Sequence, residues 1–383
     1  MELERELHMV PGDGETSYAK NSRLQREEKA LLEVRPMLEK AVTEVCMTLS
    51  PRTMVVADLG CSSGPNALLF VSGVAAMVED HCKRSGHRPP PPELHFFLND
   101  LPSNDFNHLF RSLERFKKLP IDSESECKHG GEMVAAPPQY IVGLPGSFYT
   151  RLFPSQSVHL FHSCYSLMWL SQLPAELQVS SKLHPNEGNI YITKNTPPLV
   201  VRMYQEQFKK DLSMFLELRA KELVFGGQML LTFLGRKNDD VFDGDLNHLC
   251  GLLGQAMQSL VAEGIVEKKS LDSFNLPIYG PSIEEVTTVV SQSSLFEISH
   301  IRLFNLNWDP YDDSTSDLVG NIVQSGVNVA RCLRAVAEPL LASHFGECIL
   351  DELFKRYACN VSKHLEREKT KFSVIVVSLK CKP

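Results

Sequence analysis

Two glycines and an acidic side chain follow the first strongly apolar segment of the chain. The segment Met54–Leu59 carries Asp58 near its end, and Gly60 and Gly64 lie in the turn after it. Glycines in a strand-to-helix turn let the backbone approach a ligand closely, at the edge where parallel α/β sheets bind nucleotides. Asp100 ends the next short apolar segment. We therefore expect two carboxylates and a glycine turn at one edge of a sheet.

Three classes of enzyme use a glycine-containing turn after a strand. A nicotinamide-binding turn has the spacing GxGxxG, and here Ser62 replaces its second glycine. Gly60–Gly64 also matches GxSxG, the nucleophile turn of α/β-hydrolases, but that turn normally follows several strands and here one strand precedes it. In an adenosylmethionine-binding turn, Asp58 would lie near the methionine portion and Asp100 would accept both ribose hydroxyls. The two carboxylates favour this third class, and helix capping is the structural alternative for both.

The hydrophobic pattern around this turn predicts alternating strands and helices. The predicted strands are Met54–Leu59, Leu94–Leu98, Tyr140–Gly143, Val158–Cys164 and Gln228–Leu234. The predicted helices are Gln25–Leu49, Ala67–Cys82 and Pro198–Leu223, the last of them ended by Gly226 and Gly227. Because strands and helices alternate, the pattern predicts an α/β fold with a doubly wound, mostly parallel sheet and right-handed crossovers.

The carboxyl-terminal half breaks this alternation. Residues 247–263 and 317–369 have mainly helical spacing, whereas 296–306 and 372–379 have the pattern of strands. We expect both strands to join the same sheet and the helices to cap its carboxyl edge. The expected organisation is an N-terminal arm and helix (1–50), a cofactor-binding core (51–236), helical cap segments (237–293 and 307–371) and two core strands (294–306 and 372–383).

Five segments of the chain carry longer motifs. They are Ser17–Ser22, Asp58–Asn66, Phe97–Asn107, Pro145–Tyr149 and Ser163–Ser171. Together these segments resemble the plant carboxyl and N-methyltransferases of the SABATH family, and similarity at Leu271–Pro277 and Asn328–Leu340 extends the match over nearly the whole chain. The resemblance implies a class I, Rossmann-like methyltransferase fold with a helical cap, and S-adenosylmethionine as the methyl donor.

The resemblance also implies roles for individual residues. The adenosylmethionine contacts of the family match Tyr18, Ser22, Asp58, Cys61, Asn66, Asp100, Leu101, Ser147 and Phe148. Its substrate-lining segment matches Tyr165, Met168 and Trp169, and an apolar lining would be completed by Leu234, Leu249, Cys250, Tyr279, Leu333 and Phe372. A metal site of some members matches Asn186, Asp272, Phe274 and Asn275, whose oxygen atoms would suit Mg²⁺.

The activity that this resemblance implies is methyl esterification of a small aromatic acid: salicylate, benzoate or anthranilate. A carboxylic acid with a pKa of about 4 is ionised at neutral pH, so in-line transfer of the methyl group needs no general base. Gln25 matches the amide that, with the indole N–H of Trp169, holds the substrate carboxylate. These two neutral donors are the expected catalytic residues.

Two positions depart from the salicylate pattern of the family. Met168 resembles the salicylate and benzoate branch, but Val10 replaces a lysine and Cys250 replaces a large aromatic residue. A wider cavity would admit indole-3-acetate, jasmonate or a terpenoid acid, which is the second hypothesis. The third is a non-catalytic member that binds an acid without turnover.

Composition limits the partners and the compartment. The 383 residues are 43% hydrophobic and carry a net charge of −8, which is the wrong sign for binding a nucleic-acid backbone. The sequence has no apolar run of membrane-spanning length, its amino terminus is too charged for a secretory signal, and its ten cysteines form no CxxC pair. We expect a cytoplasmic protein with reduced thiols and a small-molecule carboxylic acid as its partner, and a homodimer is allowed.

Overall fold

A mixed seven-stranded sheet forms the centre of the computed structural model, which describes residues 3–24, 28–85, 91–118, 137–178, 185–312, 314 and 318–383. Its strands, in the order β3-β2-β1-β4-β5-β7-β6, are β1 (Thr53–Leu59), β2 (Glu93–Asp100), β3 (Gln139–Pro145), β4 (Val158–Cys164), β5 (Leu223–Gly235), β6 (Phe296–Asn307) and β7 (Lys371–Cys381). Strands β1 to β5 are parallel, whereas β7 is antiparallel to both β5 and β6. The prediction of a doubly wound, mostly parallel α/β sheet is confirmed.

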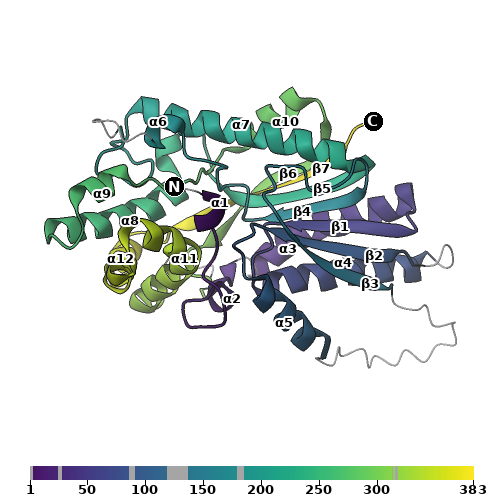
Figure 1. The fold of residues 1–383 in the computed structure, drawn as a ribbon, viewed down its shortest axis with the longest axis horizontal. Helices are drawn as coiled ribbons and strands as arrows, with labels where there is room; N and C mark the ends of the chain where they lie inside the picture. Colours follow the sequence, from purple (N-terminus) through teal and green to yellow (C-terminus); the bar gives the residue numbers. More distant parts are fainter. Residues whose placement is uncertain are drawn as a thin grey trace.

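Helices cover both faces of this sheet (Figure 1). One face carries α3 (Glu28–Glu44) with its π-helical extension η2 (Val45–Leu49), α4 (Pro65–Arg84) and α5 (Phe106–Lys118); the other carries α7 (Pro198–Glu222) and α10 (Ile283–Ser293). Central strands buried under helices on both sides need apolar residues at nearly every position. The second half of β1 and most of β7 are accordingly buried throughout.

The remaining helices form a cap beyond one end of the sheet (Figure 1). They are α8 (Asp245–Ala262), α9 (Lys268–Ser273), α11 (Ile322–Phe345) and α12 (Leu350–Leu365), with the short helices α1 (Leu3–Glu6), α2 (Tyr18–Asn21) and α6 (Ala175–Gln178) and the 3₁₀ turns η3 (Val241–Asp243) and η4 (Glu347–Ile349). The N-terminal arm is tied to α11, because the Val10 N–H donates to the Ala335 carbonyl at 2.9 Å. Within the described residues, no helix is both long enough and apolar enough to cross a bilayer.

The strand order creates a crevice at one edge of the sheet. From β1 the chain adds β2 and β3 on one side and then returns to add β4 on the other. At such a reversal the loops leave neighbouring strands in opposite directions, and ligands of α/β proteins bind in the space between them. The carboxyl ends of β1, β2, β3 and β4 therefore define the place to look for a site.

Several predicted boundaries differ from the structure, and two of these differences concern the ends of helices. From residue 28 on, the helix predicted over residues 25–49 is the α-helix α3 followed by a π-helical turn; residues 25–27 lie outside the described residues. Gly226 and Gly227 do not end α7, which stops at Glu222; they lie inside β5. A Cβ atom at Gly227 would lie 2.9 Å from the Val224 carbonyl oxygen, so glycine there permits close packing within the strand region.

Candidate functional site

The turn after β1 brings its backbone unusually close to a neighbouring loop. Gly60 has a φ of +79°, and a Cβ atom at this position would lie 2.2 Å from the Ser166 Oγ. The N–H groups of Gly60 and Cys61 both donate to the Asn99 carbonyl at 2.9 Å. The turn is therefore fixed against the end of β2, and only glycine fits at its first position.

Asp100, at the end of β2, presents its carboxylate to a cavity above this turn. Its Oδ2 accepts the Ser62 N–H at 2.7 Å and its Oδ1 accepts the Leu101 N–H at 2.8 Å. Burial raises the pKa of Asp100 to about 6, partly offset by these two hydrogen bonds. Each carboxylate oxygen can accept more than one donor, so the group can hold two ligand hydroxyls in addition.

Ser62 and Tyr165 line the same cavity with left-handed backbone conformations, at φ values of 54° and 55°. Such conformations cost about 1–3 kcal/mol in a residue other than glycine and persist where surrounding contacts impose them. The Tyr165 N–H donates to the Thr232 carbonyl of β5 at 2.7 Å. The chain consequently turns sharply after β4, and residues 165–171 lie along the cavity.

The loop of residues 146–153 forms a further wall. Asn99 Nδ2 donates to the carbonyls of Leu144 and Gly146, both at 2.8 Å, which ties the start of the loop to the end of β2. The Tyr149 hydroxyl donates to the Trp169 carbonyl at 2.8 Å. This last bond joins the 146–153 loop to the segment after β4, so the two walls hold each other in place.

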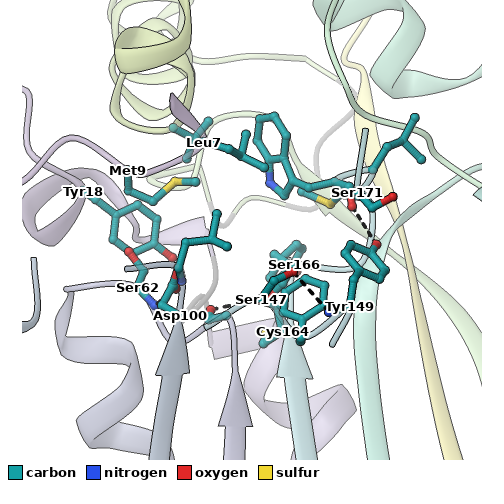
Figure 2. A pocket seen from close by; sticks show the side chains of 18 residues that line it. Leu7, Met9, Tyr18, Ser62, Asp100, Ser147, Tyr149, Cys164, Ser166 and Ser171 are labelled. Atoms are coloured by element: carbon teal, nitrogen blue, oxygen red, sulfur yellow. Dashed lines mark hydrogen bonds between the residues drawn. The ribbon is translucent and has the colours of Figure 1, made fainter. Parts of the chain in front are cut away.

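The N-terminal arm closes this first cavity from the opposite side. Figure 2 shows Leu7, Met9 and Tyr18 across the cavity from Ser147 and Cys164. Tyr18 is buried, and desolvation raises the pKa of its phenol, which stays neutral at physiological pH. The complete lining is Leu7, Met9, Tyr18, Gly60, Ser62, Asp100, Leu101, Ser147, Phe148, Tyr149, Cys164, Tyr165, Ser166, Met168, Trp169, Leu170, Ser171 and Val336.

A second, mostly apolar cavity adjoins the first. The two share Tyr165, Met168, Trp169 and Val336. The rest of its lining is Asn21, Leu24, Leu234, Leu246, Leu249, Cys250, Leu276, Ile278, Trp308, Val329, Cys332, Leu333, Ala337 and Phe372. The shared residues stand at the junction, so a group bound in one cavity can meet a group bound in the other there.

Several residues predicted from the sequence as cofactor contacts gather in the first cavity, and others do not. Those that line it are Tyr18, Asp100, Leu101, Ser147 and Phe148. Those outside its lining are Ser22, Asp58, Cys61 and Asn66. The Asp58 carboxylate instead lies 2.7 Å from His162 Nδ1, and the Phe70 ring stacks on that imidazole at 4.1 Å. The Asp58 side chain thus joins β1 to β4.

The predicted acid-binding residues show a similar division. Those that line the second cavity are Tyr165, Met168, Trp169, Leu234, Leu249, Cys250, Leu333 and Phe372. Tyr279 does not line either cavity; its hydroxyl is hydrogen-bonded to Glu285 at 2.9 Å and to Arg236 at 3.0 Å. Its role as a lining residue therefore stays a prediction, and its hydroxyl is engaged by the Arg236–Glu285 ion pair. Gln25 lies outside the described residues.

The residues predicted as a magnesium site are Asn186, Asp272, Phe274 and Asn275. The Asn186 amide N–H donates to Asn275 Oδ1 at 2.9 Å. Asp272 accepts the Gly188 N–H at 2.9 Å and the Lys268 ammonium at 2.7 Å. Across the described part of the chain, no group of three or more His, Cys, Asp or Glu side chains could hold a metal ion. The magnesium prediction is not supported, because the side-chain oxygen atoms of Asp272 and Asn275 already accept hydrogen bonds from Lys268, the Gly188 N–H and the Asn186 amide.

Some lining residues were not predicted from the sequence. Leu7 and Met9 come from the arm, and Val336 comes from α11, more than three hundred positions away. Trp308 and Cys332 belong to the second cavity. The apolar spacing of α11 was a signal that it has a buried face, but spacing alone does not say whether a face packs on protein or borders a cavity.

Comparison with known proteins gives consistent results over the whole chain. The family described as "SAM dependent carboxyl methyltransferase" matches residues 4–382. Two Zea mays proteins, "Anthranilate O-methyltransferase 1" and "Inactive anthranilate O-methyltransferase 1", are each 56% identical over 384 residues, covering 99% of this chain and 98% of the relative. The solved structure of "Loganic acid methyltransferase with SAH" is 33% identical, with a TM-score of 0.80 and coverage of 98% of this chain and 99% of that one.

Proposed function

The chain belongs to the SAM-dependent carboxyl methyltransferases, and on this premise we propose that it esterifies a small aromatic acid, with anthranilate, benzoate and salicylate as the candidates. The observation that carries this proposal is the junction of the two cavities at Tyr165, Met168 and Trp169. One cavity has a carboxylate and aromatic rings, and the other is mainly apolar. A methyl donor and an acid bound in them would meet at the junction.

The first cavity fits S-adenosylmethionine. Asp100 would accept its ribose hydroxyls, and Tyr18 and Phe148 offer aromatic surfaces for its adenine or its positive charge. When bound, this cosubstrate supplies an activated methyl group on a sulfonium. Gly60 and Ser62 would let the backbone approach it closely, and Leu7 and Met9 would shield it from water on the side of the arm.

The side chains around the junction are suited to orienting an acid rather than to deprotonating it. No histidine or lysine is among the described residues that line the two cavities. The Asp100 carboxylate is already engaged by two backbone N–H groups. An aromatic acid is ionised at neutral pH, so its carboxylate needs only a fixed direction, and orientation of this kind can lower a barrier by about 7–11 kcal/mol.

Trp169 is the described residue that we assign to this orientation. The segment that carries Trp169 is held in place by its backbone. The backbone N–H of Trp169 donates to the Ser166 carbonyl at 3.0 Å, and Trp169 forms a β-bridge with Ile278. The indole N–H is a neutral donor, which would direct a carboxylate oxygen without neutralising its charge. Gln25, predicted from the sequence as the second donor, completes the proposal.

The second cavity supports an aromatic rather than a strongly polar acid. Its walls are mostly aliphatic and sulfur-containing, and Met168 offers a polarisable thioether to a ring. Burial raises the pKa of Cys250 to about 12, so this thiol is neutral. The similarity to a protein named as an anthranilate methyltransferase supports the same class of acid.

The proposal is tested by incubating the protein with labelled S-adenosylmethionine and each acid, and identifying products by mass spectrometry. We expect methyl esters of at least one of the three small aromatic acids. Trp169→Phe should lower kcat/KM for the acid at least tenfold while S-adenosylmethionine affinity changes less than twofold, because one carboxylate hydrogen bond is removed.

Other results would contradict specific parts of the proposal. Methylation of the anthranilate nitrogen would overturn the carboxyl assignment. Turnover of jasmonate, indole-3-acetate or a terpenoid acid alone would overturn the small aromatic substrate. Binding of acids without turnover of any of them would favour the non-catalytic alternative, for which the similarity to an inactive relative is the supporting observation.

A further inference from the structure

Asp211 is a buried carboxylate on α7 that holds one end of the segment between the two cavities. It is 1% exposed and is not part of the described lining of either cavity. Its Oδ2 accepts the Ser171 backbone N–H at 2.9 Å, and its Oδ1 accepts the Ser171 hydroxyl at 2.7 Å. The Gln207 amide, about one turn earlier on α7, donates to the same Oδ1 at 2.8 Å. Because Ser171 is the last residue of the segment 165–171, these bonds fix the end of that segment to α7.

Asp211 also acts on the middle of this segment, through Tyr149. Figure 2 shows Tyr149 and Ser171 on the same wall of the first cavity. The Tyr149 hydroxyl donates to the Trp169 carbonyl at 2.8 Å. Burial raises the pKa of this phenol, and the negative charge of Asp211 raises it further. The phenol therefore keeps the proton that it donates, and the Trp169 backbone stays tied to the 146–153 loop.

The same face of α7 holds the second segment that pairs with Trp169. Tyr204 lies about two helical turns before Asp211, so the two side chains leave α7 on one face. The Tyr204 hydroxyl donates to the Leu276 carbonyl at 3.0 Å, and Ile278 forms the β-bridge with Trp169. One helix face therefore fixes both partners of the bridge that carries the junction of the two cavities.

We propose that Asp211 is a positioning residue, which acts through Ser171 to hold Met168 and Trp169 where the methyl donor and the acid meet. This inference rests on the proposed function. Methyl transfer is sensitive to placement, because a displacement of about 1 Å can cost about a hundredfold in rate. Binding of each ligand is spread over many lining residues and depends less on this one anchor. Loss of the Asp211 hydrogen bonds should therefore slow the reaction more than it weakens binding.

Two substitutions separate the hydrogen bonds of Asp211 from its charge. Asp211→Ala removes the acceptors, and it should lower the single-turnover rate of methyl transfer at least tenfold at saturating substrates, while both dissociation constants change less than threefold. Asp211→Asn lacks the charge but keeps an oxygen for the Ser171 N–H and an amide that can donate to the Ser171 hydroxyl. It should restore the rate to within threefold of the wild type. An Asn variant as slow as the Ala variant would overturn positioning by these hydrogen bonds.

Asp245→Ala is the matched control for lost stability. Asp245, at the start of α8, accepts the same two groups of a serine, the Ser373 N–H at 3.1 Å and the Ser373 hydroxyl at 2.8 Å. It is not part of the described lining of either cavity. Like Asp211→Ala, this variant should lower the free energy of unfolding in denaturant, but its rate should stay within threefold of the wild type. Equal losses of rate in the two Ala variants would show that lost stability alone slows the reaction, and would overturn the inference.

A measurement on the free protein separates this inference from the proposed function. The chain has two tryptophans, so ¹⁵N-indole labelling gives two indole N–H signals, and Trp308→Phe identifies the Trp169 signal. Asp211→Ala should shift or broaden this signal, whereas Asp211→Asn and Asp245→Ala should leave it near its wild-type position. An unchanged Trp169 signal in Asp211→Ala would overturn the role of Asp211. The expected changes of this signal, without esterification of any acid by the wild type, would overturn the proposed function alone.

Discussion

Asp100 combines a structural role at a strand end with the binding role that we propose for it. Its hydrogen bond from the Ser62 N–H fixes the β1 turn, and its side chain lines the first cavity. Burial and the nearby Asp58 carboxylate raise its pKa, whereas the two N–H groups and His8 lower it, giving a value of about 6. This pKa lies close to physiological pH, so cosubstrate binding should depend on pH.

We expect the dissociation constant for S-adenosylmethionine to be constant above about pH 7 and to rise roughly tenfold per pH unit below the Asp100 pKa of about 6. Binding weakens at low pH because protonation of Asp100 replaces a hydrogen-bond acceptor with a donor. The neutral acid also loses its electrostatic attraction for the sulfonium. Asp100→Asn should weaken binding at least tenfold at pH 8 and remove the pH dependence. Calorimetric titration between pH 5 and 8 measures both effects. An unchanged slope in the variant would assign the titration to another group.

Arg219 and Glu222 act at the scale of elements, by joining the end of α7 to the 146–153 loop. Their side chains form an ion pair at 2.9 Å, and both are fully buried. Arg219 donates to the carbonyls of Phe148 and Thr150 at 3.2 and 2.8 Å, and Glu222 accepts the N–H of Leu152 at 2.7 Å. The end of α7 therefore holds the 146–153 loop through hydrogen bonds of both charged side chains, Arg219 and Glu222.

Arg219→Lys should loosen this loop and raise the KM for S-adenosylmethionine about tenfold, because an ammonium cannot reach two carbonyls and a carboxylate with the geometry of a guanidinium. The KM for the acid should change less than threefold. Arg356→Lys is the matched control, since Arg356 also contacts two carboxylates, those of Glu263 and Glu352, but lines neither cavity. Steady-state kinetics with each substrate varied in turn measure the change in the two KM values separately. Equal increases in both KM values would mean that the pair supports the whole fold instead.

At the scale of the whole molecule, the site depends on the fit between the sheet and the cap. The sheet contributes strand ends, whereas α11 contributes Val329, Cys332, Leu333 and Val336 to the second cavity. The position of α11 depends on α12, and the two helices pack closely at Gly326. A Cβ atom there would lie 2.1 Å from the Ser362 Oγ and 2.5 Å from the Ala358 carbonyl oxygen.

Gly326→Ala should separate α11 from α12, destabilise the protein by about 1–3 kcal/mol, and raise the acid KM because the cavity wall shifts. Gly251→Ala in α8 is the control: a Cβ atom there has no neighbour within 4 Å, so the variant should gain about 0.5–1 kcal/mol from helix propensity. Denaturant unfolding and acid kinetics measure these outcomes. If Gly326→Ala changed neither the free energy of unfolding nor the acid KM, the helices would be shown to adjust without affecting the site.

The sequence by itself determined the sheet, the glycine turn and the carboxylate at the end of β2. These features depend on local patterns: apolar runs for buried strands, glycine where the backbone has a positive φ, and acidic residues at strand ends. For the same reason the boundaries of β1 and β4 lie within one residue of their predictions.

Only the tertiary structure decided which distant segments complete the two cavities. It hydrogen-bonded the Tyr279 hydroxyl to Arg236 and Glu285, and it paired Asp272 with Lys268. Each of these depends on contacts between residues far apart in the chain. Periodicity identifies a buried face, but the partner that a buried polar atom finds is set by packing in three dimensions.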